Sequence, residues 1–248
     1  MDTLFIGKNI FKFNEISSTN DWLMSRISDQ KFNEGTVVMA STQTQGKGQR
    51  GSSWSSQVSK SLTFSVLLKP GFLSTVHAFD ISICVALAIF DSLSDLRSEF
   101  KIKWPNDIYF EDKKIGGVLI ENQMSSSVYQ NAIVGIGLNV NQKGFESLPK
   151  AISLKQILGV EFPIEKVMEC LCGTLEARYL QLRAGKFESL KKAYLSNMYW
   201  FNEMHFYKSQ NELMQAKIID VLRNGCLQLE LIDGEIRDFD IKEIEFVA

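Results

Sequence analysis

Short segments of the chain supply glycines, cations, side-chain amides and one carboxylate. They are Gly46–Gly51 (GKGQRG), Lys103–Asp107 (KWPND) and Lys114–Gly117 (KIGG), and a fourth segment, Gly135–Asn139 (GIGLN), places two glycines before an asparagine. Lysine and amide groups bind anions, and glycine lets a ligand approach the backbone closely. Together, the segments predict a cleft for a flat ligand that bears an anion.

The first segment has the spacing G-x-G-x-x-G of a dinucleotide site, but its surroundings do not fit one. In that site the glycines join a strand to a helix, whose N-terminus binds the pyrophosphate. Here the strand expected at 36–41 ends five residues earlier, and residues 52–59 (SSWSSQVS) have no helical apolar period. Fixing a free loop costs roughly 1–2 kcal/mol per residue. We therefore expect a loop that closes over a ligand.

The composition is typical of a soluble globular protein. The chain has 248 residues, 45% hydrophobic and 23% charged, enough for one sizeable domain or for a larger and a smaller one. Its formal net charge of −2 gives no bulk basic surface for nucleic acid or an anionic membrane. We expect no signal peptide, and the longest apolar stretch, Ile81–Phe90, is too short to span a bilayer.

The cysteines and histidines do not predict a metal site. There are four cysteines and two histidines, and their spacing does not match that of zinc ligands. We expect reduced cysteines that fill apolar space, which is typical of a cytoplasmic protein.

Hydrophobic periodicity predicts an α+β fold with a mixed, mostly antiparallel sheet and packed helices. The expected strands lie at residues 4–6, 10–14, 36–41, 61–68, 102–104, 107–110, 115–122 and 128–140. The expected helices are a short one through 22–27, with cap residues at 17–20, and others at 75–94, 153–158, 164–182 and 187–197.

The pattern changes after Asn197. Residues 200–248 alternate apolar and polar side chains, with turn pairs at Asn224-Gly225 and Asp233-Gly234. We expect a small C-terminal β-barrel, and we divide the chain into domains at 1–197 and 198–248.

Five motifs taken in order resemble the biotin protein ligases. They are SSTN (17–20), QTQGKGQRGxxW (43–54), KWPND (103–107), KIGGVLIE (114–121) and GIGLNV (135–140). The tail from Gly234 to Val247 is similar to the C-terminal barrel of that family. The resemblance implies the biotin–lipoate ligase fold, which is like that of class II synthetases, and a monofunctional type without an N-terminal DNA-binding domain.

The resemblance also implies an activity. Biotin and ATP would form biotinyl-5'-adenylate, and a lysine of a biotin carboxyl carrier protein would then take the biotin. No cofactor would be tightly bound, and Mg²⁺ would accompany ATP. Lys114 would bridge the two anions, Lys47 would close onto them from the loop, and Asp107 would orient or deprotonate the acceptor amine or help hold Mg²⁺.

Further site residues follow from the same motifs. Biotin would be bound by Ser18, Thr19, Asn20, Gln43, Gly46, Lys47, Gly48, Gln49, Lys114, Gly117, Leu119 and Gly135. The ATP and adenylate side would be formed by Lys47, Arg50, Trp54, Asn106, Lys114 and Asn139. The family loop usually reads GRGRxG, so Lys47 keeps a cation without the fork of arginine, while Gln49 loses the charge.

Three other functions compete with this one. A lipoate or octanoate ligase or transferase would share the fold and the bridging lysine, and a non-catalytic biotin-binding or sensing module would keep only the pocket. A DNA-binding repressor would need a helix-turn-helix domain before the first motif, for which we expect no room. The sequence leaves the acceptor open, as well as the choice between monomer and homodimer.

Overall fold

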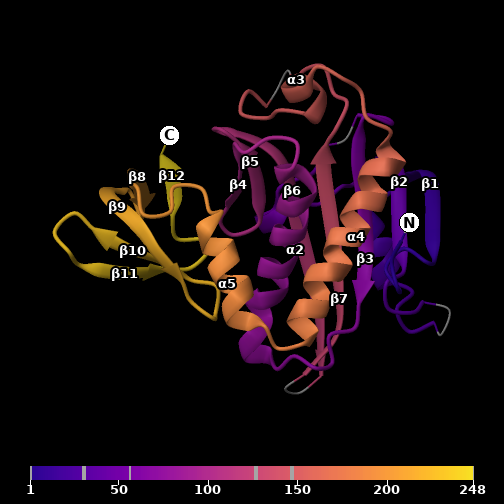
Figure 1. The fold of residues 1–248 in the computed structure, drawn as a ribbon, viewed down its shortest axis with the longest axis horizontal. Helices are drawn as coiled ribbons and strands as arrows, with labels where there is room; N and C mark the ends of the chain where they lie inside the picture. The colour runs from indigo at the N-terminus through magenta and orange to yellow at the C-terminus, as the bar shows by residue number, and fades with distance from the viewer. Residues whose placement is uncertain (1, 30–31, 56, 126–127, 146–147, 248) are drawn as a thin grey trace.

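The structure, a computed structural model, describes residues 2–29, 32–55, 57–125, 128–145 and 148–247 (Figure 1). Its main sheet has seven strands in the order β1-β2-β3-β7-β6-β5-β4. β1 and β2 run parallel and the other neighbours run antiparallel, which confirms the predicted mixed, mostly antiparallel sheet. The strands are β1 (Ile10–Ile16), β2 (Val37–Gln43), β3 (Ser61–Leu68), β4 (Phe100–Lys103), β5 (Asp107–Phe110), β6 (Lys113–Ser125) and β7 (Val128–Asn139).

Helices cover the two faces of this sheet unequally. α2 (Ala78–Ser94), α4 (Ile164–Arg183) and α5 (Phe187–Ser196) lie together over one face (Figure 1). The short α1 (Thr19–Met24) packs on the other face, where Leu23 contacts Leu67 and Ile133. The remaining helical elements are η1 (Gln49–Gly51), η2 (Thr75–His77) and α3 (Leu154–Leu158). The face that α1 only partly covers is therefore available for a site.

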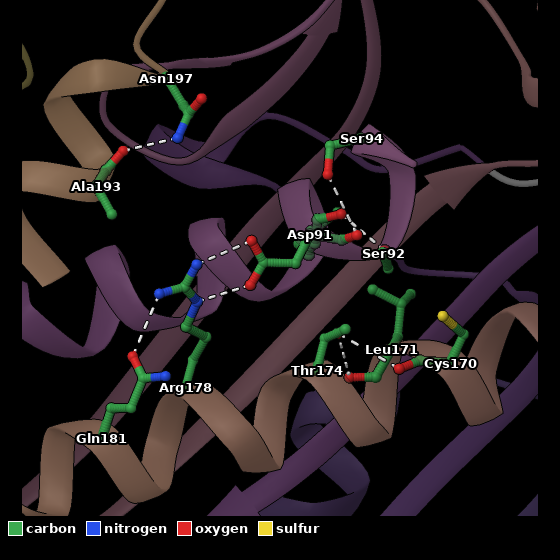
Figure 2. Close-up of polar contacts among 11 residues, drawn as sticks. Asp91, Ser92, Ser94, Cys170, Leu171, Thr174, Arg178, Gln181, Ala193 and Asn197 are labelled. Carbon is green, nitrogen blue, oxygen red and sulfur yellow. Dashed lines mark hydrogen bonds and ion pairs between the residues drawn. The ribbon is translucent and has the colours of Figure 1, made fainter. Parts of the chain in front are cut away.

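α2 is the central core helix. The segment Thr75–Ser94 reaches a mean hydropathy of 1.7, so by length and composition this helix could cross a membrane. The stretch Ile81–Phe90 inside it is by itself too short to do so. In this fold 61% of the helix's most apolar window is buried. One ion pair fixes α2 to α4: the Arg178 guanidinium donates to both carboxylate oxygens of Asp91, at 2.6 and 2.9 Å (Figure 2). A bidentate geometry sets the register of the two helices as well as their distance.

The N-terminal segment corrects one prediction. Leu4–Ile6 is not a strand; it forms a turn around the carboxylate of Glu176. The backbone N–H groups of Leu4, Phe5 and Ile6 all donate to this carboxylate, the last two at 2.8 and 2.9 Å. Burial by itself would raise the pKa of Glu176, but the three donors outweigh it and lower that pKa. In this segment the backbone N–H groups therefore donate to one carboxylate instead of to a neighbouring strand.

The first helix is shorter than predicted. α1 ends at Met24, and the chain continues toward Ile27 in tighter turns, in which the Arg26 N–H donates to the Leu23 carbonyl. Ser18 caps its start by accepting from the Asp21 N–H. The predicted N-cap cluster is therefore confirmed, whereas the last turn of the predicted helix is not α-helical.

A second, five-stranded antiparallel sheet follows α5. Its order is β11-β10-β9-β8-β12, which confirms a C-terminal β-sheet domain. Among the described residues the edge strands β11 and β12 do not pair, so the sheet is open and the closed barrel stays a prediction. The strands are β8 (Met204–Ser209), β9 (Glu212–Val221), β10 (Leu227–Leu231), β11 (Ile236–Phe239) and β12 (Glu245–Val247). Both predicted glycine turns lie between strands of this sheet. The boundary at 198 stays a prediction, since residues 197–199 still hydrogen-bond β4 through Ile102.

The cysteines follow their predicted role in part. All four are free thiols, and Cys84 and Cys172 are buried in the core. Cys170 is exposed, because it lies two residues before Cys172 on α4 and faces away from the core. Burial raises the pKa of Cys172 to about 12, so its thiol stays protonated and behaves as an apolar group.

We expect Glu176→Gln to lower the free energy of unfolding by about 1–3 kcal/mol, because three backbone donors, of which that of Ile6 is buried, lose a charged acceptor. Urea denaturation at pH 7 measures this loss. The wild-type advantage should shrink as the pH falls below the ordinary glutamate range, since a lowered pKa stabilises the fold only while the carboxylate is ionised. Glu165→Gln, at an exposed position of the same helix, is the matched control. Equal effects of both substitutions would contradict the role of Glu176.

Candidate functional site

A cavity of about 510 Å³ lies on the sheet face that carries α1. The glycine loop borders it, and the C-terminal sheet contributes Ile244 and Phe246. Most of the predicted site residues line this one cavity: Ser18, Thr19, Asn20, Gln43, Lys47, Gly48, Gln49, Trp54, Asn106, Asp107, Lys114, Gly117, Leu119 and Gly135. The predicted residues that meet here are up to 117 positions apart in the sequence, from Ser18 to Gly135.

The cavity wall is a product of strand alternation. On the cavity side β3 carries three polar side chains, Ser61, Thr63 and Ser65, and then Leu67, which packs with α1, whereas the alternate residues belong to the main core. On the neighbouring β7 the same face carries Gly135 and Gly137. The glycines of GIGLN therefore mark a place where other groups lie directly on the sheet.

Protein side chains fill the space that these glycines leave. A Cβ on Gly135 would lie 2.4 Å from the side-chain oxygen of Asn20, and a Cβ on Gly137 would lie 2.4 Å from the Trp54 ring. At Gly117 a Cβ would lie 2.9 Å from a carboxylate oxygen of Asp107. Each glycine thus leaves room for a side chain of the protein itself, and the contacts are closest at Gly135 and Gly137.

Lys114 enters the cavity because of a β-bulge. Tyr109 pairs with Lys114 while the preceding Ile108 pairs with Gly116, so β6 carries one extra residue. Lys114 and Gly117 are three residues apart, and regular alternation would put them on opposite faces. With the bulge, both line the cavity, and Ile115 remains in the core.

The ammonium of Lys114 is held at a defined point. Its Nζ lies 2.6 Å from Oδ1 of Asp107, on the neighbouring strand β5. The Lys114 backbone is fixed as well, because its N–H donates to the Lys150 carbonyl and its carbonyl accepts from Ile152. Both side chains of the pair remain partly exposed to the cavity. This arrangement offers a rigid cation, with a carboxylate beside it, to an anionic ligand.

One end of the cavity is a hydrogen-bonded polar pocket. The Gln43 side-chain oxygen accepts from the N–H and the hydroxyl of Thr19, at 2.7 and 3.0 Å. The Ser65 hydroxyl is hydrogen-bonded to the Thr19 hydroxyl and to the side-chain oxygen of Asn20, at 2.7 and 2.6 Å. The Asn20 amide donates to Glu121 at 2.7 Å. Buried polar groups tied together in this way hold fixed orientations for a ligand.

The glycine loop forms a small hairpin over the cavity. Trp54 N–H donates to the Gly46 carbonyl, and Lys47 bridges to Ser53. The Lys47 ammonium lies 2.6 Å from Asp21 on α1, and this hydrogen bond raises the pKa of Lys47. Both partners are substantially exposed, so the pair is weak enough to exchange for an anionic ligand.

Three predicted site residues are not among those that line the cavity. Gly46 lies beneath the Trp54 backbone, and a Cβ there would lie 2.4 Å from the Trp54 carbonyl. Asn139 is buried and accepts from Gln142 at 2.8 Å. The side chain of Arg50 lies outside the described part of the chain. Asn106 does line the cavity, although its amide donates to the Val118 carbonyl.

Several lining residues were missed by the sequence analysis, among them Thr63, Lys103 and Phe246. Lys103 could have been found, because it begins the KWPND motif. Its Nζ lies 4.5 Å from the ring centre of Tyr109 and 4.8 Å from that of Phe246. Phe246 belongs to β12, so its contact with Lys103 joins the two sheets. The alternation of apolar and polar residues in the C-terminal segment did not indicate that Phe246 would reach the cavity.

Trp104 makes a second connection between the two sheets. Its indole N–H donates to the Gly225 carbonyl at 3.0 Å. Gly225 has a φ of +91°, and a Cβ there would lie 2.6 Å from the ring of Phe79 on α2. The turn can approach α2 because it carries a glycine. The KWPND motif therefore connects the main sheet to the C-terminal sheet and also lines the cavity.

The described residues contain no group of three histidine, cysteine, aspartate or glutamate side chains that could hold a metal ion. Asp107 faces the cavity, but its carboxylate is paired with Lys114. A magnesium ion that arrives on a nucleotide needs only one or two protein carboxylates.

Comparison with known proteins gives consistent matches. The sequence model of the Biotin/lipoate A/B protein ligase family matches residues 13–139. The Bifunctional ligase/repressor BirA of Bacillus subtilis (strain 168) is 27% identical over 239 residues, covering 94% of this chain and 73% of that protein. The Biotin--[acetyl-CoA-carboxylase] ligase of Mycobacterium tuberculosis is 33% identical over 175 residues, which cover 68% of this chain and 63% of that protein. The solved structure of the biotin protein ligase from Aquifex aeolicus, in complex with biotin and ATP, superposes with a TM-score of 0.80 at 27% identity. The superposition covers 97% of this chain and 99% of that one.

The stability of the fold should depend on the charge of Lys103. Burial lowers the pKa of Lys103 to about 8; Asp107 and Asp112 oppose this shift, and Lys114 and Lys150 add to it. Between pH 8 and 10 the unfolded chain then binds more protons at this position, so stability rises with pH. Relative to Lys103→Met, the wild type should gain about 1–2 kcal/mol over this range, a value reduced for partial exposure.

Denaturant unfolding of both proteins at several pH values measures this difference, and the subtraction removes the titrating groups that do not contact Lys103. Lys113→Met, at an exposed position of β6, is the control and should give a flat difference. A flat difference for Lys103→Met as well would show that its ammonium is not desolvated.

Proposed function

The chain belongs to the biotin/lipoate A/B protein ligase family, and from this premise we propose that it is an ATP-dependent biotin protein ligase. It joins biotin to a lysine of an acceptor protein through biotinyl-5'-adenylate. The observation that carries the proposal is the Lys114 ammonium, fixed by Asp107 in a cavity that has a polar pocket and a cationic loop. The Aquifex aeolicus ligase with the same fold binds biotin and ATP.

The first step joins two anions. A carboxylate oxygen of biotin attacks the α-phosphorus of ATP, the bond to the bridging oxygen breaks, and pyrophosphate leaves. The reactants repel each other, so a cation between them lowers the barrier. We assign this role to Lys114, which the bulge and the flanking backbone hydrogen bonds hold rigidly. Lys47 would leave Asp21 and approach the same charges from the loop.

The polar pocket suits the ring of biotin. Biotin has a fused ring with a urea group, which offers two N–H donors and a carbonyl acceptor. Thr19, Gln43 and Asn20 are already fixed to one another, so the ring meets oriented groups at little entropic cost. Ser18 and the loop residues Gly48 and Gln49 border the same cavity.

The second step releases AMP. The amine of the acceptor lysine attacks the acyl carbon, a C–N bond forms, and the bond to the adenylate oxygen breaks. The amine must lose a proton, and Asp107 is the carboxylate beside the cation at which the acyl group would lie. We therefore assign Asp107 to orient or deprotonate the amine. Mg²⁺ enters this proposal bound to ATP.

The protein partners are part of the proposal. We infer that the acceptor is a biotin carboxyl carrier domain, since one relative bears the name Biotin--[acetyl-CoA-carboxylase] ligase. We also propose that the reaction takes place in the cytoplasm, in keeping with four free thiols and the need for ATP.

A transfer assay tests the function. The protein is incubated with labelled biotin and a carrier domain, with and without ATP and Mg²⁺. Label should appear on the carrier lysine only with ATP, and a carrier with that lysine changed to arginine should stay unlabelled. Preferential transfer of octanoate would identify a lipoate-type enzyme instead. Biotin binding without transfer would identify a non-catalytic module.

The role of Lys114 has its own test. Lys114→Ala should slow adenylate formation, followed as pyrophosphate release, by about 100-fold or more, which is comparable to losing one preorganised oxyanion donor. Lys113→Ala, one residue earlier and exposed, is the matched control and should retain the wild-type rate. An unchanged rate in Lys114→Ala would refute the assignment.

A further inference from the structure

Two buried polar atoms on the cavity wall have no hydrogen-bond partner among the described residues. They are the hydroxyl oxygen of Thr63 and the indole nitrogen of Trp54, and both residues line the cavity. Thr63 is only 4% exposed. A buried hydroxyl without a partner costs free energy of folding, so such a group requires an explanation.

The two residues lie close together on the wall. Thr63 on β3 pairs with Gly137 on β7, and both residues face the cavity side. The Trp54 ring covers Gly137: a Cβ there would lie 2.4 Å from Cε2, the ring carbon bonded to the indole nitrogen. Cross-strand neighbours have Cβ positions about 4.5–5.5 Å apart. The Trp54 ring therefore lies beside the part of the wall that carries Thr63.

The missing partner is specific to Thr63. Its neighbours on the same face of β3 are both satisfied. Ser61 accepts from Gln142 at 2.6 Å, and Ser65 is hydrogen-bonded to Thr19 at 2.7 Å. A row of three polar side chains thus has protein partners at its two ends and none in the middle, where the cavity lies.

We propose that Thr63 is a specificity-determining residue, whose hydroxyl hydrogen-bonds the urea ring of biotin and selects it over linear acyl acids. This inference rests on the proposed function. A hydroxyl both donates and accepts, so it matches a ring with N–H and carbonyl groups. An octanoyl chain has neither and leaves the hydroxyl unpaired, which is how a polar site rejects an apolar analogue.

The position of Thr63 supports the urea ring as its partner. It lies two residues along β3 from Ser65, which holds Thr19 in the polar pocket. Two residues of a strand span about 6.6 Å. A fused bicyclic ring in the pocket of Thr19 and Gln43 is large enough to reach Thr63.

Thr63→Val, which replaces the hydroxyl with a methyl group of similar shape, tests the proposal. Calorimetric titration should show biotin binding weakened about tenfold or more, with octanoate binding unchanged or tighter. The ligand-free Tm should stay the same or rise, because an unpaired polar group is removed. Thr63→Ser keeps the hydroxyl and should bind biotin within about threefold of the wild type.

Thr36→Val is the matched control. Thr36 is also buried, but its hydroxyl donates to the Asn33 carbonyl at 2.7 Å. The opposite pattern is expected there: a lower Tm with unchanged biotin affinity. If Thr63→Val lowers the Tm and Thr63→Ser fails to restore binding, Thr63 has only a packing role and the proposal is wrong.

Two further outcomes are decisive. Desthiobiotin, which keeps the urea ring and lacks the sulfur, should lose the same factor in Thr63→Val; if it does not, the assignment to the urea ring is wrong. Unchanged biotin affinity in Thr63→Val, in a protein that still transfers biotin, overturns this inference alone. Failure of the wild type to bind biotin overturns the proposed function itself.

Discussion

The site depends on one ion pair. Lys114 and Asp107 come from adjacent strands and meet 2.6 Å apart at the edge of the cavity. Two constraints create the pair: the bulge that turns Lys114 toward the cavity, and the glycine at 117, where a side chain would collide with the carboxylate. An ammonium held this firmly needs little reorganisation when charge develops beside it, and such preorganisation is where most electrostatic catalysis originates.

The rest of the cavity is arranged around that cation by strand alternation. The core side of β3 and β7 is apolar and packs under α2, so the opposite face is free to carry serines, a threonine and glycines. Asn20 and Trp54 occupy the space above two of these glycines. The same pleat that buries the core therefore supplies the polar wall of the site, and Thr63 is the point on that wall that the protein leaves unpaired.

KWPND connects the cavity to the C-terminal sheet. Trp104 binds the turn at Gly225, Lys103 lies against Phe246, and Asn106 and Asp107 line the cavity between them. Burial disfavours the charged form of Lys103, and movement of the C-terminal sheet would change the surroundings of this ammonium. The small sheet is therefore part of the site.

The sequence by itself determined the sheet type, the main helices and the C-terminal β domain, because these depend on local periodicity. The motifs by which it resembles the biotin protein ligases contain most of the residues that line the cavity. The sequence could not give the turn of Leu4–Ile6, since that is set by Glu176, far away in the chain. Nor could it show that Lys114 faces the cavity, that Phe246 borders it, or that Thr63 lacks a partner. Those facts depend on register, on one bulge and on contacts between distant segments, which only the tertiary structure decides.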